Sequence, residues 1–75
     1  MKHDHYFDSL DLSSRHKRRE TTKLAVKLVG MIHLAEYNYM ERIPVNLKES
    51  DAYYAAEETI DYLLDAINAL ENAFG

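Results

Sequence analysis

The sequence has no cysteine, one proline and two glycines in 75 residues. Without cysteine a disulfide framework is excluded, and nothing marks an oxidising compartment, so we expect a cytoplasmic protein. A strand-rich fold would lack its turns with so few turn-forming residues, and we therefore expect an all-α protein. Gly30 and Gly75 alone cannot form a glycine-rich phosphate loop.

A long hydrophobic run is also missing. The most apolar stretch, residues 24–35, is about half the length needed to cross a bilayer and contains Lys27 and His33. No apolar segment follows the polar residues 1–5, so a signal peptide is not expected. We therefore expect no membrane partner.

The remaining composition is that of a folded protein, with 47% hydrophobic and 29% charged residues. Residues 1–75 are expected to form one domain, because the length leaves no room for a second. A core this small needs support from a disulfide, a metal or a partner chain, and the disulfide is excluded.

Two long helices are predicted, over residues 14–41 and 50–73. Ser13 or Ser14 can cap the first helix, Pro44 disfavours its continuation, and Ser50 can cap the second. A short linker makes the helices antiparallel neighbours, so the fold class is all-α, an antiparallel two-helix hairpin. Residues 1–13 are expected to form an arm or a short capping segment.

The second helix carries one apolar seam at alternating steps of three and four residues. It consists of Tyr53, Ala56, Ile60, Leu63, Ile67, Leu70 and Phe74. The first helix has two neighbouring apolar stripes. The hairpin-facing stripe is predicted at Ala25, Leu28, Ile32, Ala35 and Tyr39, and the second contains Val26, Val29, His33, Tyr37 and Met40.

This second stripe predicts self-association. Leaving it in water forfeits about 1.5–3 kcal/mol for each large side chain, which a small hairpin cannot lose several times. We expect a homodimer forming a four-helix bundle, with Val26, Val29 and His33 at the dimer contact. In the alternative, residues 1–12 fold back over the stripe and the chain stays monomeric.

Charge is unevenly distributed, with a basic cluster at residues 15–19 and eight acidic residues against two basic ones in residues 41–75. Pairing of the basic cluster with Asp65 and Glu71 on the antiparallel helix would explain it structurally. The functional alternative is an RNA- or DNA-binding hairpin that contacts phosphates through Arg15, Lys17, Arg18 and Arg19.

Catalytic and metal-binding patterns are weak. No cysteine nucleophile exists and the serines fit helix caps, so we do not expect an enzyme. Residues 3–5, His-Asp-His, could contribute to a metal site, but no further metal ligands follow at a defined spacing. The order of His33 and Glu36 is the reverse of the Glu-x-x-His pattern of helical-bundle metal sites. Neither a metal nor another cofactor is therefore predicted.

Tyrosine is abundant, with six in the chain, and four of them flank the interhelical linker. Tyrosine and methionine are enriched at protein interfaces. We expect Tyr37, Met40 and Tyr54 to contact a larger protein partner, with Glu57, Asp61 and Asp65 as an acidic docking face for a basic partner. The predicted function is thus a non-catalytic regulator or inhibitor that acts by steric occlusion.

Overall fold

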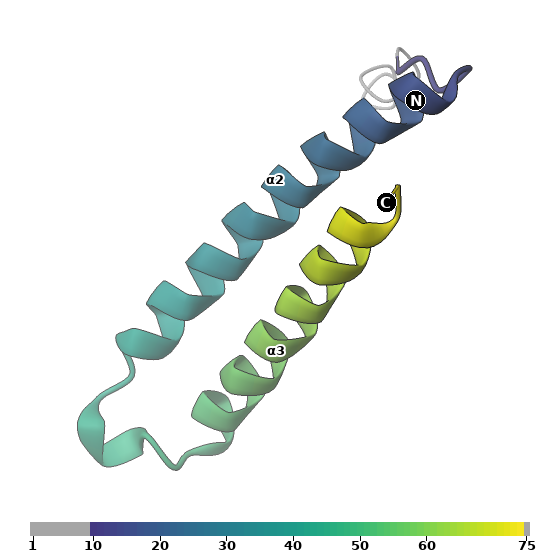
Figure 1. Cartoon of the computed structure of the whole chain (residues 1–75). Coiled ribbons are helices and arrows are strands. Elements are labelled where there is room, and N and C mark those ends of the chain that lie inside the picture. The colour runs from purple at the N-terminus through teal and green to yellow at the C-terminus, as the bar shows by residue number, and fades with distance from the viewer. Residues whose placement is uncertain (1–9, 75) are drawn as a thin grey trace, which may run out of the picture.

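The computed structural model describes residues 10–74 as an antiparallel helical hairpin (Figure 1). Helix α2 spans Arg15–Glu41, the short 3-10 helix η2 spans Val45–Leu47, and α3 spans Asp51–Asn72. The described residues contain no strand, and α2 packs against α3. The prediction of an all-α hairpin is confirmed for this part of the chain.

Helix α2 begins and ends where its sequence favours a boundary. The Ser14 hydroxyl accepts a hydrogen bond from the Lys17 backbone N–H at 3.1 Å, which satisfies one of the unpaired donors of the first turn. At the other end, the Arg42 N–H still bonds to the carbonyls of Asn38 and Tyr39. Pro44 follows two residues later and has an extended backbone that closes the helix.

The connection spans residues 42–50, contains η2 and leads directly into α3. The Leu47 N–H donates to the Pro44 carbonyl at 2.8 Å, and the Ser50 N–H donates to the Leu47 carbonyl at 3.0 Å. Ser50 then caps α3, because its hydroxyl accepts from the Tyr53 N–H at 3.3 Å. Asp51 occupies the first turn, where the helix dipole favours a negative charge.

Replacing Ser50 with alanine is expected to lower the free energy of unfolding by about 1 kcal/mol, because the Tyr53 N–H loses its acceptor. Urea denaturation followed by circular dichroism measures the change. Ser50→Asp keeps a capping acceptor and should retain most of the stability. Equal midpoints for wild type and Ser50→Ala would contradict the capping role.

The core lies at the linker end of the hairpin and is small. Met40, Ala56 and Ile60 are its buried residues, with Tyr53 packed against them. Along α3, every predicted seam residue is buried or half-buried, and every other residue from 51 to 72 is exposed. The predicted seam of the second helix is therefore confirmed.

The predicted seam of the first helix is wrong. The residues of α2 that are buried or half-buried at steps of three and four are instead Thr22, Val26, Val29, His33, Glu36 and Met40. Leu28 is 46% exposed, Ile32 55% and Tyr39 49%. The physical reason is that α2 is apolar over two adjacent sides, and α3 covers the side that contains Thr22, His33 and Glu36.

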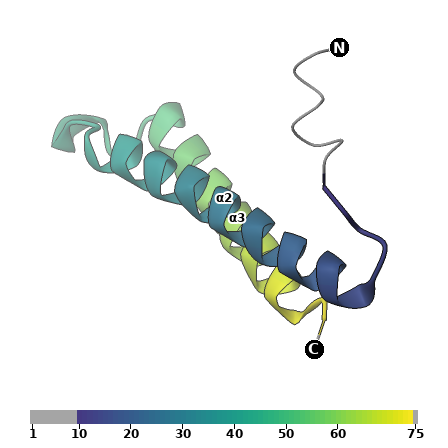
Figure 2. The ribbon, with the colours of Figure 1, turned by 90° about the horizontal axis from the view of Figure 1, so that it is seen from above.

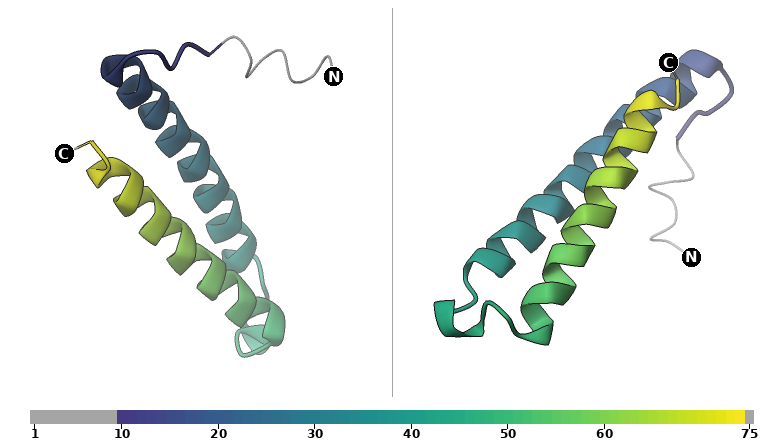
Figure 3. Two further views of the ribbon diagram at one scale, coloured as in Figure 1. Left: turned by 90° about the vertical axis from the view of Figure 1, so that its right-hand side faces the viewer. Right: turned by 60° about the horizontal axis from the view of Figure 1, so that its bottom comes forward.

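The hairpin is a single layer of helices. Its smallest dimension is 14 Å, close to the ~10–12 Å diameter of one helix. Seen from above, α2 lies over α3 for most of its length (Figure 2), and no third element among residues 10–74 covers either side of the pair (Figure 3). A domain normally needs two packed layers to enclose a core, so both sides of this layer stay open.

Neither α2 nor α3 combines the length and the hydrophobicity that crossing a lipid bilayer requires; this finding covers residues 10–74. The segment before α2 leaves Leu10 and Leu12 exposed. Within the described residues, it therefore does not fold over the apolar side chains of α2. Residues 1–9, which were also predicted to cover this stripe in the monomeric alternative, lie outside the described part of the chain.

Gly30 lies within the continuous helix α2, without a steric reason for glycine. A Cβ atom built at this position would meet no atom within 4 Å. Gly30→Ala is therefore expected to raise the free energy of unfolding by about 0.5–1 kcal/mol, because glycine loses more backbone entropy in a helix. A thermal melt measures the gain, with Asn38→Ala as an exposed control on the same helix. A lower melting temperature for Gly30→Ala would contradict this prediction and show that an added methyl group at position 30 clashes with a neighbouring group.

Candidate interaction surfaces

The two sides of the hairpin can be separated by helix geometry. Consecutive residues of an α-helix are rotated by about 100°. The residue just before each α3-facing position of α2 therefore points to one side of the layer, and the residue just after it points to the other. Because the helices are antiparallel and both right-handed, the preceding residues of α2 and of α3 share one side.

The side made by the preceding residues carries no charge, and we name it the uncharged face. Twelve positions at the chain-wide charged fraction of 29% would hold three or four charged residues. The uncharged face consists of Thr21, Ala25, Leu28, Ile32, Ala35 and Tyr39 on α2 and of Ala52, Ala55, Thr59, Tyr62, Ala66 and Ala69 on α3. Toward the open end, the next residue on this side is Arg18, opposite the end of α3.

The side made by the following residues is half charged, and we name it the charged face. It consists of Lys23, Lys27, Gly30, Leu34, Tyr37 and Glu41 on α2 and of Tyr54, Glu57, Asp61, Leu64, Asn68 and Glu71 on α3. Each side exposes four large apolar or aromatic side chains, so the two sides of the hairpin differ in their charge and not in the number of such residues.

The structure separates the residues predicted to bind a second copy from the exposed apolar surface. Val26, Val29 and His33 are half-buried on the side of α2 that faces α3. They contribute to the hairpin itself. The uncharged face remains exposed for a contact with a second copy, and its large exposed side chains are Leu28, Ile32, Tyr39 and Tyr62.

The residues predicted to bind a larger partner fall mostly on the charged face. Tyr37, Tyr54, Glu57 and Asp61 are exposed there together, and the exposed Asp65 continues the acidic row along α3. Met40 is a correction, because it is only 9% exposed and belongs to the core with Ala56 and Ile60.

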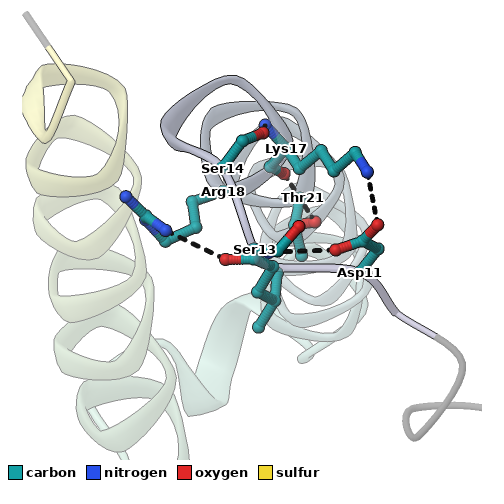
Figure 4. Close-up of polar contacts among 7 residues, drawn as sticks. Asp11, Ser13, Ser14, Lys17, Arg18 and Thr21 are labelled. Atoms are coloured by element: carbon teal, nitrogen blue, oxygen red, sulfur yellow. Dashed lines mark hydrogen bonds and ion pairs between the residues drawn. The ribbon is translucent and has the colours of Figure 1, made fainter.

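The basic cluster at the start of α2 is engaged in contacts within the chain. Lys17 forms an ion pair with Asp11, and the Arg18 guanidinium donates to the Leu12 carbonyl at 2.9 Å (Figure 4). The Lys17 ammonium and a hydrogen bond from Ser13 lower the pKa of the Asp11 carboxyl to about 2. These contacts fasten residues 11–13 to the first turn of the helix.

The other two cations of the cluster lie over an aromatic ring. The guanidinium carbon of Arg15 is 4.9 Å from the centroid of the Phe74 ring, and that of Arg19 is 5.9 Å from it. Both are cation–π distances. The contact also brings positive charge to the C-terminal end of α3, where the helix dipole is negative. This supplies a structural reason for a basic helix start.

The predicted pairing of the basic cluster with Asp65 and Glu71 is not found. The ion pairs within residues 10–74 are Lys17–Asp11 and Lys23–Glu20. An open groove of about 380 Å³ lies instead between the helices at this end. Its walls combine Arg19, Lys23 and Glu71 with the apolar Val26, Leu70 and Phe74.

No group of three or more histidine, aspartate or glutamate side chains suited to a metal ion occurs within the described residues. The sequence His-Asp-His at positions 3–5 lies outside them. His33 faces α3, and its Nε2 atom is buried without a hydrogen-bond partner in the described part of the chain. A buried nitrogen without a partner costs free energy rather than supplying it.

Replacing His33 with leucine is accordingly expected to stabilise the hairpin by about 1 kcal/mol, because the unsatisfied nitrogen is removed and an apolar side chain is buried. Urea midpoints measure the change. His16→Leu, at an exposed position of the same helix, is the matched control and should change stability little. A loss of stability in His33→Leu would show that the imidazole makes a stabilising hydrogen bond.

Comparison with known proteins gives no relative to set beside this arrangement. No model of a protein family matches the chain, and neither a curated protein nor a solved structure matches it. The two faces of the hairpin are therefore the features from which a function can be proposed.

Proposed function

We propose that this chain is a non-catalytic protein–protein interaction module. Two copies pair through their uncharged faces into a four-helix bundle, and the bundle binds a larger protein and modulates or inhibits it by occluding its surface. The observation that supports the pairing is the uncharged face. This side of the one-layer hairpin has six successive positions on each helix, and none of the twelve carries a charge.

The uncharged face has the size of a dimer interface. The 22 residues of α3 span about 33 Å, and two adjacent helices are about 20 Å wide, which gives a footprint of roughly 650 Å². Stable interfaces bury about 800 Å² of accessible surface on each partner, and accessible area exceeds a flat footprint. One copy of the hairpin can therefore cover another completely.

A second copy also satisfies the electrostatics. The chain has a net charge of −4, so the repulsion between two copies is weakest when their carboxylates stay in water, where it is screened. Pairing of uncharged faces leaves the acidic residues of α3 on the outside of the bundle. It also encloses the small side chains of α3, Ala52, Ala55, Ala66 and Ala69, which allow close helix approach.

The contact residues of the dimer are thus proposed to be Leu28, Ile32, Tyr39 and Tyr62, in place of Val26, Val29 and His33. A cytoplasmic location is part of the proposal and rests on the absence of cysteine. Nucleic-acid binding has less support, because Arg15, Lys17, Arg18 and Arg19 all have partners within the chain.

Thiol labelling tests the pairing without any partner. The chain has no cysteine, so single variants Ile32→Cys and Leu34→Cys each carry one thiol. Their positions are 55% and 59% exposed in one copy but lie on opposite faces. The dimer predicts that a maleimide modifies position 32 at least tenfold more slowly than position 34 at high protein concentration. Equal rates at all concentrations would contradict the proposal.

A further inference from the structure

The charged face carries a second surface, near the linker end, that pairing of the uncharged faces leaves open. Apolar and aromatic side chains lie there beside carboxylates. We name it the acidic-aromatic patch and define it as Leu34, Tyr37, Tyr54, Glu57, Asp61 and Leu64. The four apolar and aromatic side chains of the patch are between 43% and 59% exposed.

The half-buried Tyr53 lies next to this patch. The Tyr53 and Tyr54 rings meet edge to face with centroids 6.2 Å apart. Burial raises the pKa of the Tyr53 hydroxyl, and Glu57, Glu41, Tyr37 and Tyr54 lie close enough to raise it further. Tyrosines and glutamates of both helices therefore lie around Tyr53 at the linker end of the hairpin.

The charge of the patch is one-sided. Helix α3 contains six acidic residues and no lysine or arginine. Neither ion pair within residues 10–74 involves an α3 carboxylate. The nearby Lys48 is occupied by this chain, since its ammonium lies 5.0 Å from the Tyr53 ring centroid and donates to the Met40 carbonyl at 3.4 Å.

We propose that the acidic-aromatic patch binds a basic amphipathic helix of a partner protein, with apolar residues on Leu34, Tyr37 and Leu64 and lysine or arginine residues beside Glu57 and Asp61. Exposed tyrosines and leucines supply the apolar contact, and the α3 carboxylates select cations. A helix presents both kinds of side chain at spacings of three and four residues. The inference rests on the partner-binding part of the proposed function and names the chemistry of that partner.

The test uses the full chain and a synthetic peptide of about 18 residues, long enough for helix formation. Its leucines lie on one side, its lysines on the other, and it contains one tryptophan. Because the chain has no tryptophan, the peptide fluorescence reports binding alone. A counterpart with glutamate in place of lysine is the specificity control. We expect binding of the lysine peptide that weakens with added salt, and no binding of the glutamate peptide.

Matched variants locate the binding site. Glu57→Gln with Asp61→Asn removes two charges from the patch and should weaken binding by about tenfold or more. Glu49→Gln with Glu71→Gln removes two charges elsewhere and should change binding little. Leu34→Glu with Leu64→Glu should abolish the apolar contact.

Three results would overturn the inference. These are the absence of peptide binding, equal binding of both peptides, and equal weakening by the two pairs of charge-removing variants. Each of these results can be distinguished from a failure to dimerise, because sedimentation of the same samples without peptide measures the oligomeric state independently. A monomer that still binds the lysine peptide through this patch would refute the pairing and support the patch.

Discussion

Replacing Ile60 with aspartate is expected to leave the chain unfolded at room temperature. Ile60 is one of the three buried residues among residues 10–74 and packs with Met40 and Ala56. An unpaired carboxylate at this position costs several kcal/mol. A domain of this size rarely has more than about 3–5 kcal/mol of stability to lose. Far-ultraviolet circular dichroism should show loss of the helical signal.

Two control variants separate burial from the chemistry of the substitution. Asn68→Asp places the same carboxylate at an exposed position of α3 and should fold normally. Ile60→Val removes one methylene and should cost about 0.5–1.5 kcal/mol. A cooperative melt of Ile60→Asp close to that of the wild type would show that the core has been assigned to the wrong residues.

Placing glutamate at both Leu28 and Ile32 is expected to separate the dimer. Pairing would bury these two side chains in the interface, so each carboxylate must be desolvated when the faces meet. A cost of about 1.4 kcal/mol corresponds to a tenfold change in affinity. Two buried charges on each copy should therefore raise the dissociation constant by at least about 100-fold, as measured by sedimentation velocity.

The control for this experiment uses two leucines whose exposure matches that of the substituted residues. Leu34 and Leu64 have similar exposure to Ile32 and Leu28 but lie on the charged face. Leu34→Glu with Leu64→Glu adds the same two charges and should leave self-association unchanged. If both double variants dissociate equally, the effect comes from net charge rather than from the uncharged face.

The sequence predicts α3 better than α2, and the reason is the width of the apolar surface. Helix α3 has one dominant apolar seam, flanked by alanines on one side and carboxylates on the other, so periodicity identifies the side that faces α2. Helix α2 is apolar on two adjacent sides. Hydrophobicity favours the stripe with Leu28 and Ile32, but the structure turns the stripe with His33 and Glu36 toward α3.

This reversal has a physical explanation if the hairpin is half of a bundle. A helix in a four-helix bundle contacts two neighbours, so it needs two apolar sides. Periodicity finds both sides and does not say which neighbour covers which. The more apolar side then belongs to the contact between copies, and the side with some polar residues belongs to the contact within one chain.

The surfaces were predictable only in part. Tyr37, Tyr54, Glu57 and Asp61 were each predicted to bind a partner, and the structure places them on one face. Met40 is instead buried, because it packs with Ala56 and Ile60. The uncharged face could not be predicted from the periodicity of each helix alone. It becomes visible once the α3-facing positions of α2 are known, because the residues preceding them then fall on the same side as the corresponding residues of α3.

Sedimentation equilibrium of the purified chain tests the central claim most directly. The pairing of uncharged faces predicts a species of twice the 8.7 kDa chain mass that dissociates on dilution without forming larger assemblies, because a closed twofold contact uses the face completely. A mass of one chain at every concentration, with the helical signal intact, would show that the hairpin tolerates its exposed apolar side and would contradict the account.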